Sequence, residues 1–161
     1  MKKVISLLAL LAGAAAAADI QTVRALDPRN LANGMRIPCE GYCDQPYVVV
    51  TSNGTWVCTL TTGKGLEGQP GQHVVTSTSR DRGKTWSPLT DIEPENGPEA
   101  SWVTPLLTPY GRIYAFYTYN GDNVVTLPNS DRRVRSDTHG WYVFRYSDDD
   151  GATWSAQRYR I

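Results

Sequence analysis

One octapeptide occurs twice in this chain of 161 residues, and the duplication constrains the fold more than any other sequence feature. The copies read SRDRGKTW at residues 79–86 and SDDDGATW at residues 147–154, so they begin 147 − 79 = 68 residues apart. A motif repeated at this spacing predicts two copies of one supersecondary unit. The shared residues are Ser79, Asp81, Gly83, Thr85 and Trp86 in the first copy and Ser147, Asp149, Gly151, Thr153 and Trp154 in the second.

Each octapeptide has the residue types of a tight turn that is held by its own side chains. The Asp and Ser side chains can accept hydrogen bonds from backbone amides of the turn. The Gly allows a positive φ angle where the chain reverses. The Trp is expected to open the next strand and to pack its indole under the turn. The octapeptides are therefore predicted to be structural and not catalytic.

The rest of the sequence favours strands. The whole chain contains nine Tyr and five Trp, and no segment after Asp19 sustains helical apolar periodicity beyond about two turns. Two units with the same internal order are predicted, and four antiparallel strands per repeat are typical of a β-propeller blade, so the expected fold class is all-β. The expected strands are residues 47–51, 55–62, 73–79 and 85–90, then 102–108, 112–119, 141–147 and a strand that begins at residue 153.

The first residues have the order of a secretory signal peptide. Lys2 and Lys3 precede an apolar run at residues 4–11, and the alanines at 14–18 offer a cleavage site after Ala18. The alternative is an uncleaved anchor, although the apolar run is short for a membrane span. The protein is expected to be secreted or periplasmic, with residues 1–18 removed and residues 19–161 forming a partial propeller.

Charge and cysteine content limit the classes of partner, disulfide and cofactor that are expected. Without Lys2 and Lys3 the chain has 14 basic and 16 acidic residues, which gives no reason to expect nucleic acid or a membrane surface as a partner. An exported chain can form a Cys39–Cys43 or a Cys43–Cys58 bridge with one thiol left over. His73 does not lie at a metal-ligand spacing from these cysteines, so neither a metal nor another cofactor is expected.

The pattern Ser-x-Asp-x-Gly-x-Thr-Trp resembles the Asp box of sialidases and other BNR-repeat proteins, and the resemblance covers roughly residues 36–161. In that family the box lies between the third and fourth strands of a blade, and the propeller has six blades. The resemblance implies that this chain supplies about two blades, at about 47–90 and 101–157. Their open sheet edges could also mediate self-association.

The resemblance also implies a function. The chain would be the N-terminal part of an exo-glycoside hydrolase that acts on terminal sialic acid or a related sugar through a Tyr nucleophile. The Tyr/Glu nucleophile pair of the family belongs to later blades, so the chain by itself is expected to be inactive. The alternative is a non-catalytic BNR-repeat propeller that binds a glycan or a protein.

Candidate site residues are expected opposite the octapeptides, where the long polar loops gather. These loops are residues 38–46, 63–72, 91–101 and 120–140. Twelve of the ionisable residues on these loops are the candidates: Glu40, Asp44, Glu67, Glu95, Glu99, Asp122, Asp131, Arg132, Arg133, Arg135, Asp137 and His139.

Arg36 is the first candidate substrate-binding residue. The segment Met35-Arg36-Ile37-Pro38 is similar to the (Phe/Tyr)-Arg-Ile-Pro motif of sialidases, whose arginine binds the substrate carboxylate, a task that suits a planar guanidinium. The family motif runs almost directly into the first strand, whereas residues 39–45 intervene here. If the strand that begins at residue 47 sets the register, Asp44 stands where the arginine of the family motif would be. Asp44 is therefore an alternative pocket residue and a catalytic candidate. Otherwise Arg36 is an ordinary surface arginine.

Two further groups complete the prediction. The family has an aspartate acid/base in the loop after the second strand, and Glu67 is the sole acidic residue of that loop here. Glu67 could act as a general acid if burial raised its pKa, or it could be a solvated loop residue. Arg132, Arg133 and Arg135 could form an anion-binding wall or the solvated edge of their loop.

Overall fold

The computed structural model describes residue 27 and residues 29–161. The predicted signal peptide, residues 1–18, lies outside the described residues. The chain divides into two compact units, Met1–Arg36 and Ile37–Ile161, and each is considered by itself. No helix in the described part of the chain is long and apolar enough to cross a membrane.

The described part of the first unit contains one turn of 3-10 helix, η1 (Leu31–Asn33). Asn30 caps it, because its side-chain oxygen accepts a hydrogen bond from the Ala32 amide at 3.0 Å. Arg36, the predicted substrate-binding residue, is the last residue of this unit.

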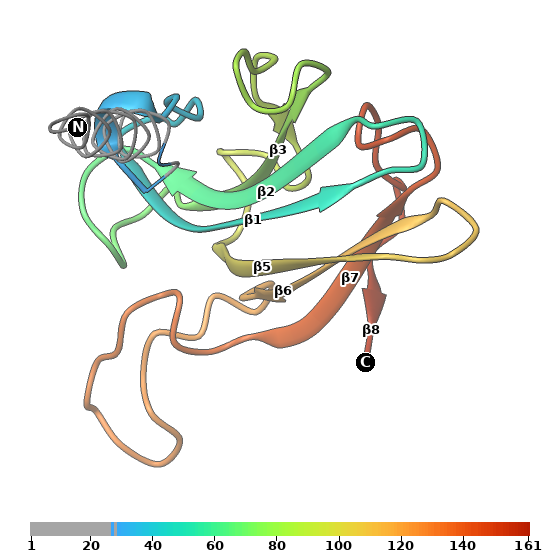
Figure 1. Cartoon of the computed structure of the whole chain (residues 1–161). Coiled ribbons are helices and arrows are strands. Elements are labelled where there is room, and N and C mark those ends of the chain that lie inside the picture. Colours follow the sequence, from blue (N-terminus) through green and yellow to red (C-terminus); the bar gives the residue numbers. More distant parts are fainter. Residues whose placement is uncertain (1–26, 28) are drawn as a thin grey trace, which may run out of the picture. The chain divides into compact units, whose positions relative to one another are not determined.

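The second unit consists of two four-stranded antiparallel sheets (Figure 1). The first contains β1 (Tyr42–Val50), β2 (Trp56–Gly63), β3 (His73–Ser79) and β4 (Thr90–Asp91) in that spatial order. The second contains β5 (Ala100–Leu107), β6 (Ile113–Tyr119), β7 (Trp141–Ser147) and β8 (Tyr159–Arg160), again in sequence order. Neither sheet closes on itself. In both sheets the four strands lie side by side in the order of the sequence. This confirms the predicted repeat of four-stranded blades.

Strand bounds differ from the prediction in two places. β1 begins at Tyr42 and not at residue 47, because an irregularity between Asp44 and Tyr47, with Gln45 at φ 49°, lets the strand continue through Pro46. Asp44 is therefore a strand residue paired with Thr61. The fourth strands are also shorter than predicted: each has two residues, and neither begins at the octapeptide Trp.

A serine after each Trp explains why the fourth strand starts late. The Ser87 amide donates to the Thr78 carbonyl at 2.8 Å, while the Ser87 hydroxyl accepts from the Thr78 amide at 2.9 Å. Ser155 makes the same two bonds with Tyr146, at 2.8 and 3.2 Å. A side chain thus takes the place of a backbone acceptor in both blades, and regular pairing resumes only afterwards. The repeated motif is therefore nine residues long.

The two octapeptide turns have the same hydrogen bonds. Asp81 Oδ1 accepts from the Thr85 amide at 2.8 Å, and Ser79 Oγ accepts from the Gly83 amide at 2.8 Å. In the second turn Asp149 accepts from Thr153 at 2.8 Å, and Ser147 accepts from Gly151 at 2.9 Å. Gly83 and Gly151 have φ angles of 81° and 82°. Each turn is thus held by the hydrogen bonds of its own side chains.

The second turn also fastens one blade to the other. A Cβ atom on Gly151 would lie 2.7 Å from Cγ1 of Val57 and 3.1 Å from Cγ2 of Thr76, both in the first sheet. Trp154 packs against a buried cluster drawn from both sheets: Val74, Ile92, Ala100, Val103, Ala115, Tyr117 and Val143. The hydrophobic core therefore lies between the blades. Trp86, in contrast, packs on the first sheet's other face with Cys58, Leu60 and Val75.

A buried carboxylate joins the blades beside this core. Glu93 follows β4 and is 1% exposed, and the Arg158 guanidinium donates to its two oxygens at 2.6 Å each. Arg145 Nε lies 3.2 Å from Glu93 Oε1, and the Tyr117 hydroxyl donates to the same oxygen. Two guanidinium groups compensate the buried charge, so the interface tolerates an ionised carboxylate.

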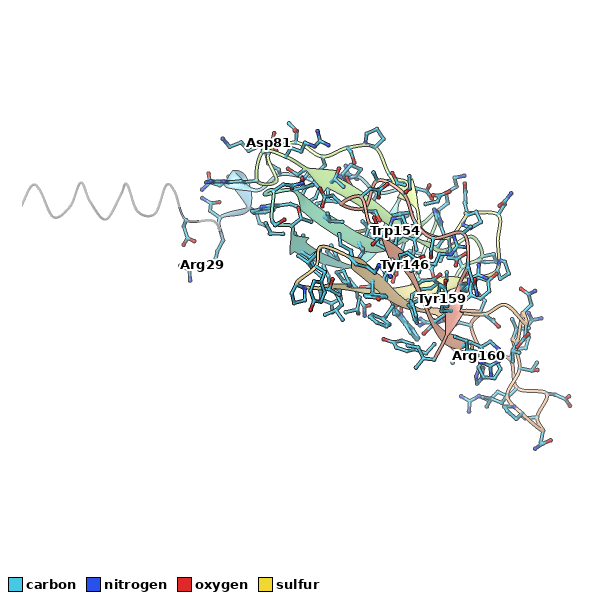
Figure 2. All side chains as sticks on the ribbon, turned by 90° about the vertical axis from the view of Figure 1, so that its right-hand side faces the viewer. Arg29, Asp81, Tyr146, Trp154, Tyr159 and Arg160 are labelled. Carbon is cyan, nitrogen blue, oxygen red and sulfur yellow. The ribbon has the colours of Figure 1, made fainter. Side chains whose placement is uncertain are left out.

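The second sheet presents an aromatic face on its far side. In β6, Ile113, Ala115 and Tyr117 are buried, whereas the alternate residues Tyr114 and Phe116 are only half-buried. Phe144 stacks on Tyr159 with ring centroids 5.1 Å apart, and Tyr146 lies 6.1 Å from Tyr159 (Figure 2). The Arg112 guanidinium covers Tyr146 at 4.1 Å.

The cysteines are not bridged in this structure. No disulfide joins Cys39, Cys43 and Cys58, so neither of the two expected bridges is present. Burial, and to a smaller degree Cys43, raises the pKa of the Cys58 thiol to about 12. The Cys58 thiol is thereby kept protonated.

Replacement of Trp154 by alanine is expected to lower the free energy of unfolding by about 2 kcal/mol, because it removes an indole that is partly buried against the inter-blade core. Trp141→Ala is the matched control: its indole is 42% exposed and lies outside that core. We expect the control to cost less than about 1 kcal/mol. Urea unfolding followed by circular dichroism would measure both, and equal losses would contradict the assigned core.

The hydrogen bonds of the first octapeptide turn predict an unusually acidic aspartate. The Thr85 side chain and amide, with the Ser79 hydroxyl, lower the pKa of Asp81 to about 2. A depressed pKa in the folded state means that this stabilisation is present at neutral pH and is lost as the pH falls towards 2. A carboxyl NMR titration should show this midpoint, and Thr85→Val should raise it. An unchanged midpoint in the variant would contradict the assignment.

Candidate functional site

The antiparallel order of the strands separates two ends of the second unit. The turns after β1 and β5 and both octapeptides lie at one end, where the Asn53 amide donates to Asp150 and Arg112 pairs with Asp148 at 2.7 Å. The long connections 64–72, 92–99 and 120–140 lie at the other end. Two shallow hollows occur at the octapeptide end, one lined by Asn53, Gly54, Thr55 and Arg80 and the other by Thr108, Tyr110, Arg112, Tyr114 and Asp148. The candidate site lies at the long-loop end.

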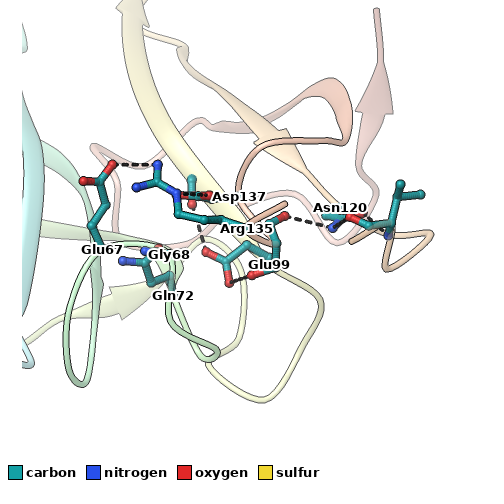
Figure 3. Close-up of polar contacts among 10 residues, drawn as sticks. Glu67, Gly68, Gln72, Glu99, Asn120, Arg135 and Asp137 are labelled. Atoms are coloured by element: carbon teal, nitrogen blue, oxygen red, sulfur yellow. Dashed lines mark hydrogen bonds and ion pairs between the residues drawn. The ribbon is translucent and has the colours of Figure 1, made fainter. Parts of the chain in front are cut away.

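Arg135 is the central cation of this site (Figure 3). Arg135 lies in the β6–β7 loop, and its Nη2 donates to Glu67 Oε1 at 2.9 Å. Glu67 belongs to the β2–β3 loop of the other blade. Its Nε donates at 3.0 Å to Asp137, whose side chain is 1% exposed. The Glu67 carboxylate raises the pKa of Arg135. One guanidinium thus joins the long loops of the two blades.

Gly68 makes room for this arginine. Its φ angle is 76°, and a Cβ atom at this position would lie 2.4 Å from Cδ of Arg135. The Gly68 amide donates to the Gln72 side-chain oxygen at 3.0 Å, and this hydrogen bond stabilises the conformation of the β2–β3 loop. The absence of a side chain at Gly68 lets the Arg135 stem lie directly against the backbone of the β2–β3 loop.

Glu99 is a second buried carboxyl group at the start of β5. It is 7% exposed, and its two oxygens accept from the Ser101 hydroxyl at 3.0 Å and the Ser136 hydroxyl at 3.4 Å. Burial is the main cause that raises the pKa of Glu99 to about 7, and the nearby Asp137 adds to the rise. A carboxyl group that can hold or release a proton near neutral pH therefore lies beside Asp137.

Asn120 anchors the long loop to the end of β6. Its side-chain amide donates to the carbonyls of Val124 at 3.0 Å and Ser136 at 2.8 Å, and its oxygen accepts from the Val124 amide at 2.8 Å. Its backbone amide donates to the Glu99 carbonyl at 2.8 Å. Both ends of the loop are thereby tied, through Asn120, to the residue that precedes β5.

Asp44 enters the same site from β1. Burial, followed by the adjacent Asp44 carboxylate, raises the pKa of the Tyr42 hydroxyl, and Glu67 and Asp137 act on it in the same direction. Three carboxylates from three segments therefore act on one hydroxyl. Both Tyr42 and Asp44 pair with β2, opposite Gly63 and Thr61 respectively.

The other predicted site residues are placed as follows. The Glu67 side chain is 48% exposed and ion-paired, so it does not have the burial that its proposed role as a general acid requires. Arg132 and Arg133 are exposed on a small hairpin of the loop, where Thr126 pairs with Arg133. Arg135 alone of these three arginines has an ion pair to the first blade in the described part of the chain. The roles of all these residues, and of Arg36, remain predictions.

The site is acidic: Glu67 and Asp137 pair with Arg135, while Glu99 interacts with Asp137 and Asp44 with Tyr42. Such a group can bind hydroxyl groups, which donate to carboxylates, and can transfer a proton at a carboxyl whose pKa is near neutral. No group of three or more His, Cys, Asp or Glu side chains that could hold a metal ion occurs among the described residues.

Sequence reasoning did not single out Tyr42, Gln72, Glu99, Asn120 or Asp137. Glu99 and Asp137 were two of the twelve ionisable residues named in the long loops, and no local pattern distinguishes them from the solvated ones. Burial distinguishes them, and burial depends on how the loops of two blades meet. The available signal was placement: Glu99 immediately precedes a strand, and Asp137 follows an arginine by two residues.

No protein-family model and no curated protein matches this sequence. Two solved structures resemble its fold. A protein of unknown function from Dyadobacter fermentans DSM 18053 aligns with a TM-score of 0.55 and 19% identity over 71% of this chain and 35% of its own. The Hadza microbial sialidase Hz136 aligns with a TM-score of 0.55 and 19% identity over 80% of this chain and 31% of its own.

The chain thus spans about a third of the length of each of these structures, 35% and 31%. Together with the two open four-stranded sheets, the similarity shows a distant sialidase-like all-β fold that amounts to part of a β-propeller. This confirms the fold class predicted from the sequence.

The Gly68–Arg135 contact predicts a specific loss of stability. Gly68→Ala should displace Arg135 and leave the buried Asp137 carboxylate without its cation, because the new Cβ overlaps the arginine stem. Gly71→Ala is the control, since Gly71 has φ 93° but open space within 4 Å of where its Cβ would lie. We expect Gly68→Ala to cost about 1–3 kcal/mol more than Gly71→Ala in urea unfolding. Equal costs would mean that the contact contributes nothing beyond backbone strain.

Proposed function

We propose that this chain is part of an exported exo-glycoside hydrolase of the sialidase type, that it acts on terminal sialic acid or a related sugar, and that its octapeptide turns are Asp boxes. The single observation that supports this most is the carboxylate cluster around Arg135. It joins the long loops of two sialidase-like blades at the end opposite the two identical turns. The similarity to the Hadza microbial sialidase is consistent with it at the level of the fold.

In the proposed reaction the acidic residues act on the glycosidic bond and the arginines bind the sugar. Glycoside hydrolysis passes through an oxocarbenium-like transition state and needs a group that gives a proton to the leaving oxygen. Asp44 is our candidate for that group, because it lies on β1 beside the Tyr42 hydroxyl. Glu67 is the alternative. Arg36, Arg132, Arg133 and Arg135 are the candidates for binding the carboxylate of the sugar.

One observation favours the second candidate function, a propeller that binds glycans without hydrolysing them. The acidic residue of the β2–β3 loop, Glu67, is paired with Arg135 at 2.9 Å. A carboxylate that already accepts from a guanidinium can also accept from the hydroxyl groups of a sugar, which suits binding.

Ligand binding by the chain of 161 residues separates the two functions. The first probe is N-acetylneuraminic acid, and the second is its 2,3-didehydro analogue, whose flattened ring imitates the transition state. A site built for catalysis should bind the analogue at least about tenfold more tightly, since enzymes favour the transition state over the ground state. A binding module should bind both with similar affinity.

Variants assign the binding to the proposed site. Asp44→Asn and Arg135→Ala should weaken binding at least about tenfold, which corresponds to 1.4 kcal/mol. Asp148→Asn is the control, because Asp148 lies at the octapeptide end in an ion pair with Arg112. We expect no release of methylumbelliferone from its sialoside by this chain. Failure of both probes to bind, or equal losses in the control, would contradict the proposal.

A further inference from the structure

Two buried glutamates lie where the blades meet, and they differ in whether a cation is paired with them. Glu93 is held by the guanidinium groups of Arg158 and Arg145. Glu99 has the hydroxyls of Ser101 and Ser136 as its side-chain donors, and none of the ion pairs among the described residues includes it. A buried carboxylate without a cation is costly, and such a group ordinarily takes up a proton.

Asp137, the neighbour of Glu99, has one carboxylate oxygen without a hydrogen-bond donor among the described residues. Asp137 uses Oδ1 to accept from Arg135, while its Oδ2 is buried and has no hydrogen-bond partner among the described residues. Asp137 acts electrostatically on the Glu99 carboxyl group, and two carboxyl groups that interact in a buried site repel each other when both are ionised. A proton retained on Glu99 removes the repulsion and leaves Asp137 as the ionised partner of Arg135.

The pair lies where the long loop meets the body of the protein. Glu99 belongs to the start of β5, whereas Ser136 and Asp137 belong to the end of the loop 120–140. From Asp137 the contacts continue through Arg135 to Glu67 on the first blade (Figure 3). The protonation state of Glu99 therefore acts on a chain of contacts that holds the loop over both blades.

We propose that Glu99 is a positioning residue which anchors the loop 120–140 in its protonated form, so that loss of this proton releases the loop from the blade junction. This goes beyond the proposed hydrolysis or binding of a glycan, because it concerns the loop in the free protein. It gives the site a pH-dependent shape: the loop is held at acidic pH and loosened at alkaline pH.

The direction follows from proton linkage. The pKa of Glu99 is raised from 4.5 to about 7 while the loop is held, and it returns towards 4.5 when the carboxyl reaches water. The held state therefore binds the proton more tightly, and its advantage is complete at acidic pH and is lost as the pH rises from about 4.5 to about 7. The loop should open roughly a hundredfold more often above this window than below it.

Other titratable and charged groups lie on the elements around Glu99, and each could contribute a pH dependence of its own. Asp137, Arg135 and His139 lie on the loop, and Asp44 and Tyr42 lie on β1. The β2–β3 connection and the first residue of β3 add Glu67 and His73, and the end of β6 adds Tyr119. The test must therefore assign the dependence to Glu99 itself.

Hydrogen exchange of the full chain, corrected for the intrinsic effect of pH on amide exchange, is the first measurement. Peptides from residues 121–139 should be protected at about pH 5 and should lose roughly a hundredfold of that protection by about pH 8. Glu99→Gln, which is neutral at every pH, should keep the protection across the range. Glu95→Gln is the control, because Glu95 is an exposed glutamate paired with Lys64, and it should retain the wild-type dependence.

Protection that does not change with pH in the wild type would overturn the proposal, as would a Glu99→Gln variant with the wild-type dependence. A carboxyl NMR titration of the unmodified protein keeps the test decisive if Glu99→Gln does not fold. One glutamate resonance should then have its midpoint near 7. Ordinary acidic midpoints for all glutamates would equally overturn the proposal. Neither readout contains a glycan, so failure here is distinct from failure of the proposed function.

Discussion

The packing of the first sheet on the second is the constraint on which the rest of this structure depends. An open four-stranded sheet has two faces, and each blade buries one of them against the other blade. Trp154 packs against that interface, Gly151 allows the second turn to approach the first sheet, and Glu93 is paired inside it with Arg145 and Arg158. Because apolar burial and a compensated charge act at the same interface, the two blades are expected to be stable only together.

The same interface determines where chemistry can occur. Each blade ends in rigid, self-bonded turns on one side and in long polar loops on the other, so the two sets of loops meet across the interface. Arg135 and Glu67 face each other there only because the sheets fix the loops that carry them. The candidate site is therefore a property of the pair of blades, since the second blade supplies Arg135 and Asp137 while the first supplies Glu67.

The fold could be predicted from the sequence to a large extent, because its signals are local. The duplicated octapeptide, the alternation of Tyr and Phe with Ala and Ile in β6, and the short turns all act within a few residues. The late start of β4 and β8 was missed, since it depends on a serine side chain that replaces a backbone acceptor. The site was predicted only in outline: Asp44, Glu67 and Arg135 were singled out, whereas Glu99 and Asp137 acquire their character from burial between loops distant in sequence.

Native-state hydrogen exchange of β2 and β6 tests the central claim, that the inter-blade interface makes the two sheets one cooperative unit. The amides at the centres of β2 and β6 should open with free energies that agree within about 1 kcal/mol, and low denaturant should lower both together. If β6 and β7 opened at a clearly lower free energy while β2 and β3 stayed protected, the sheets would be independent. The interface would then not be the feature that holds the site together.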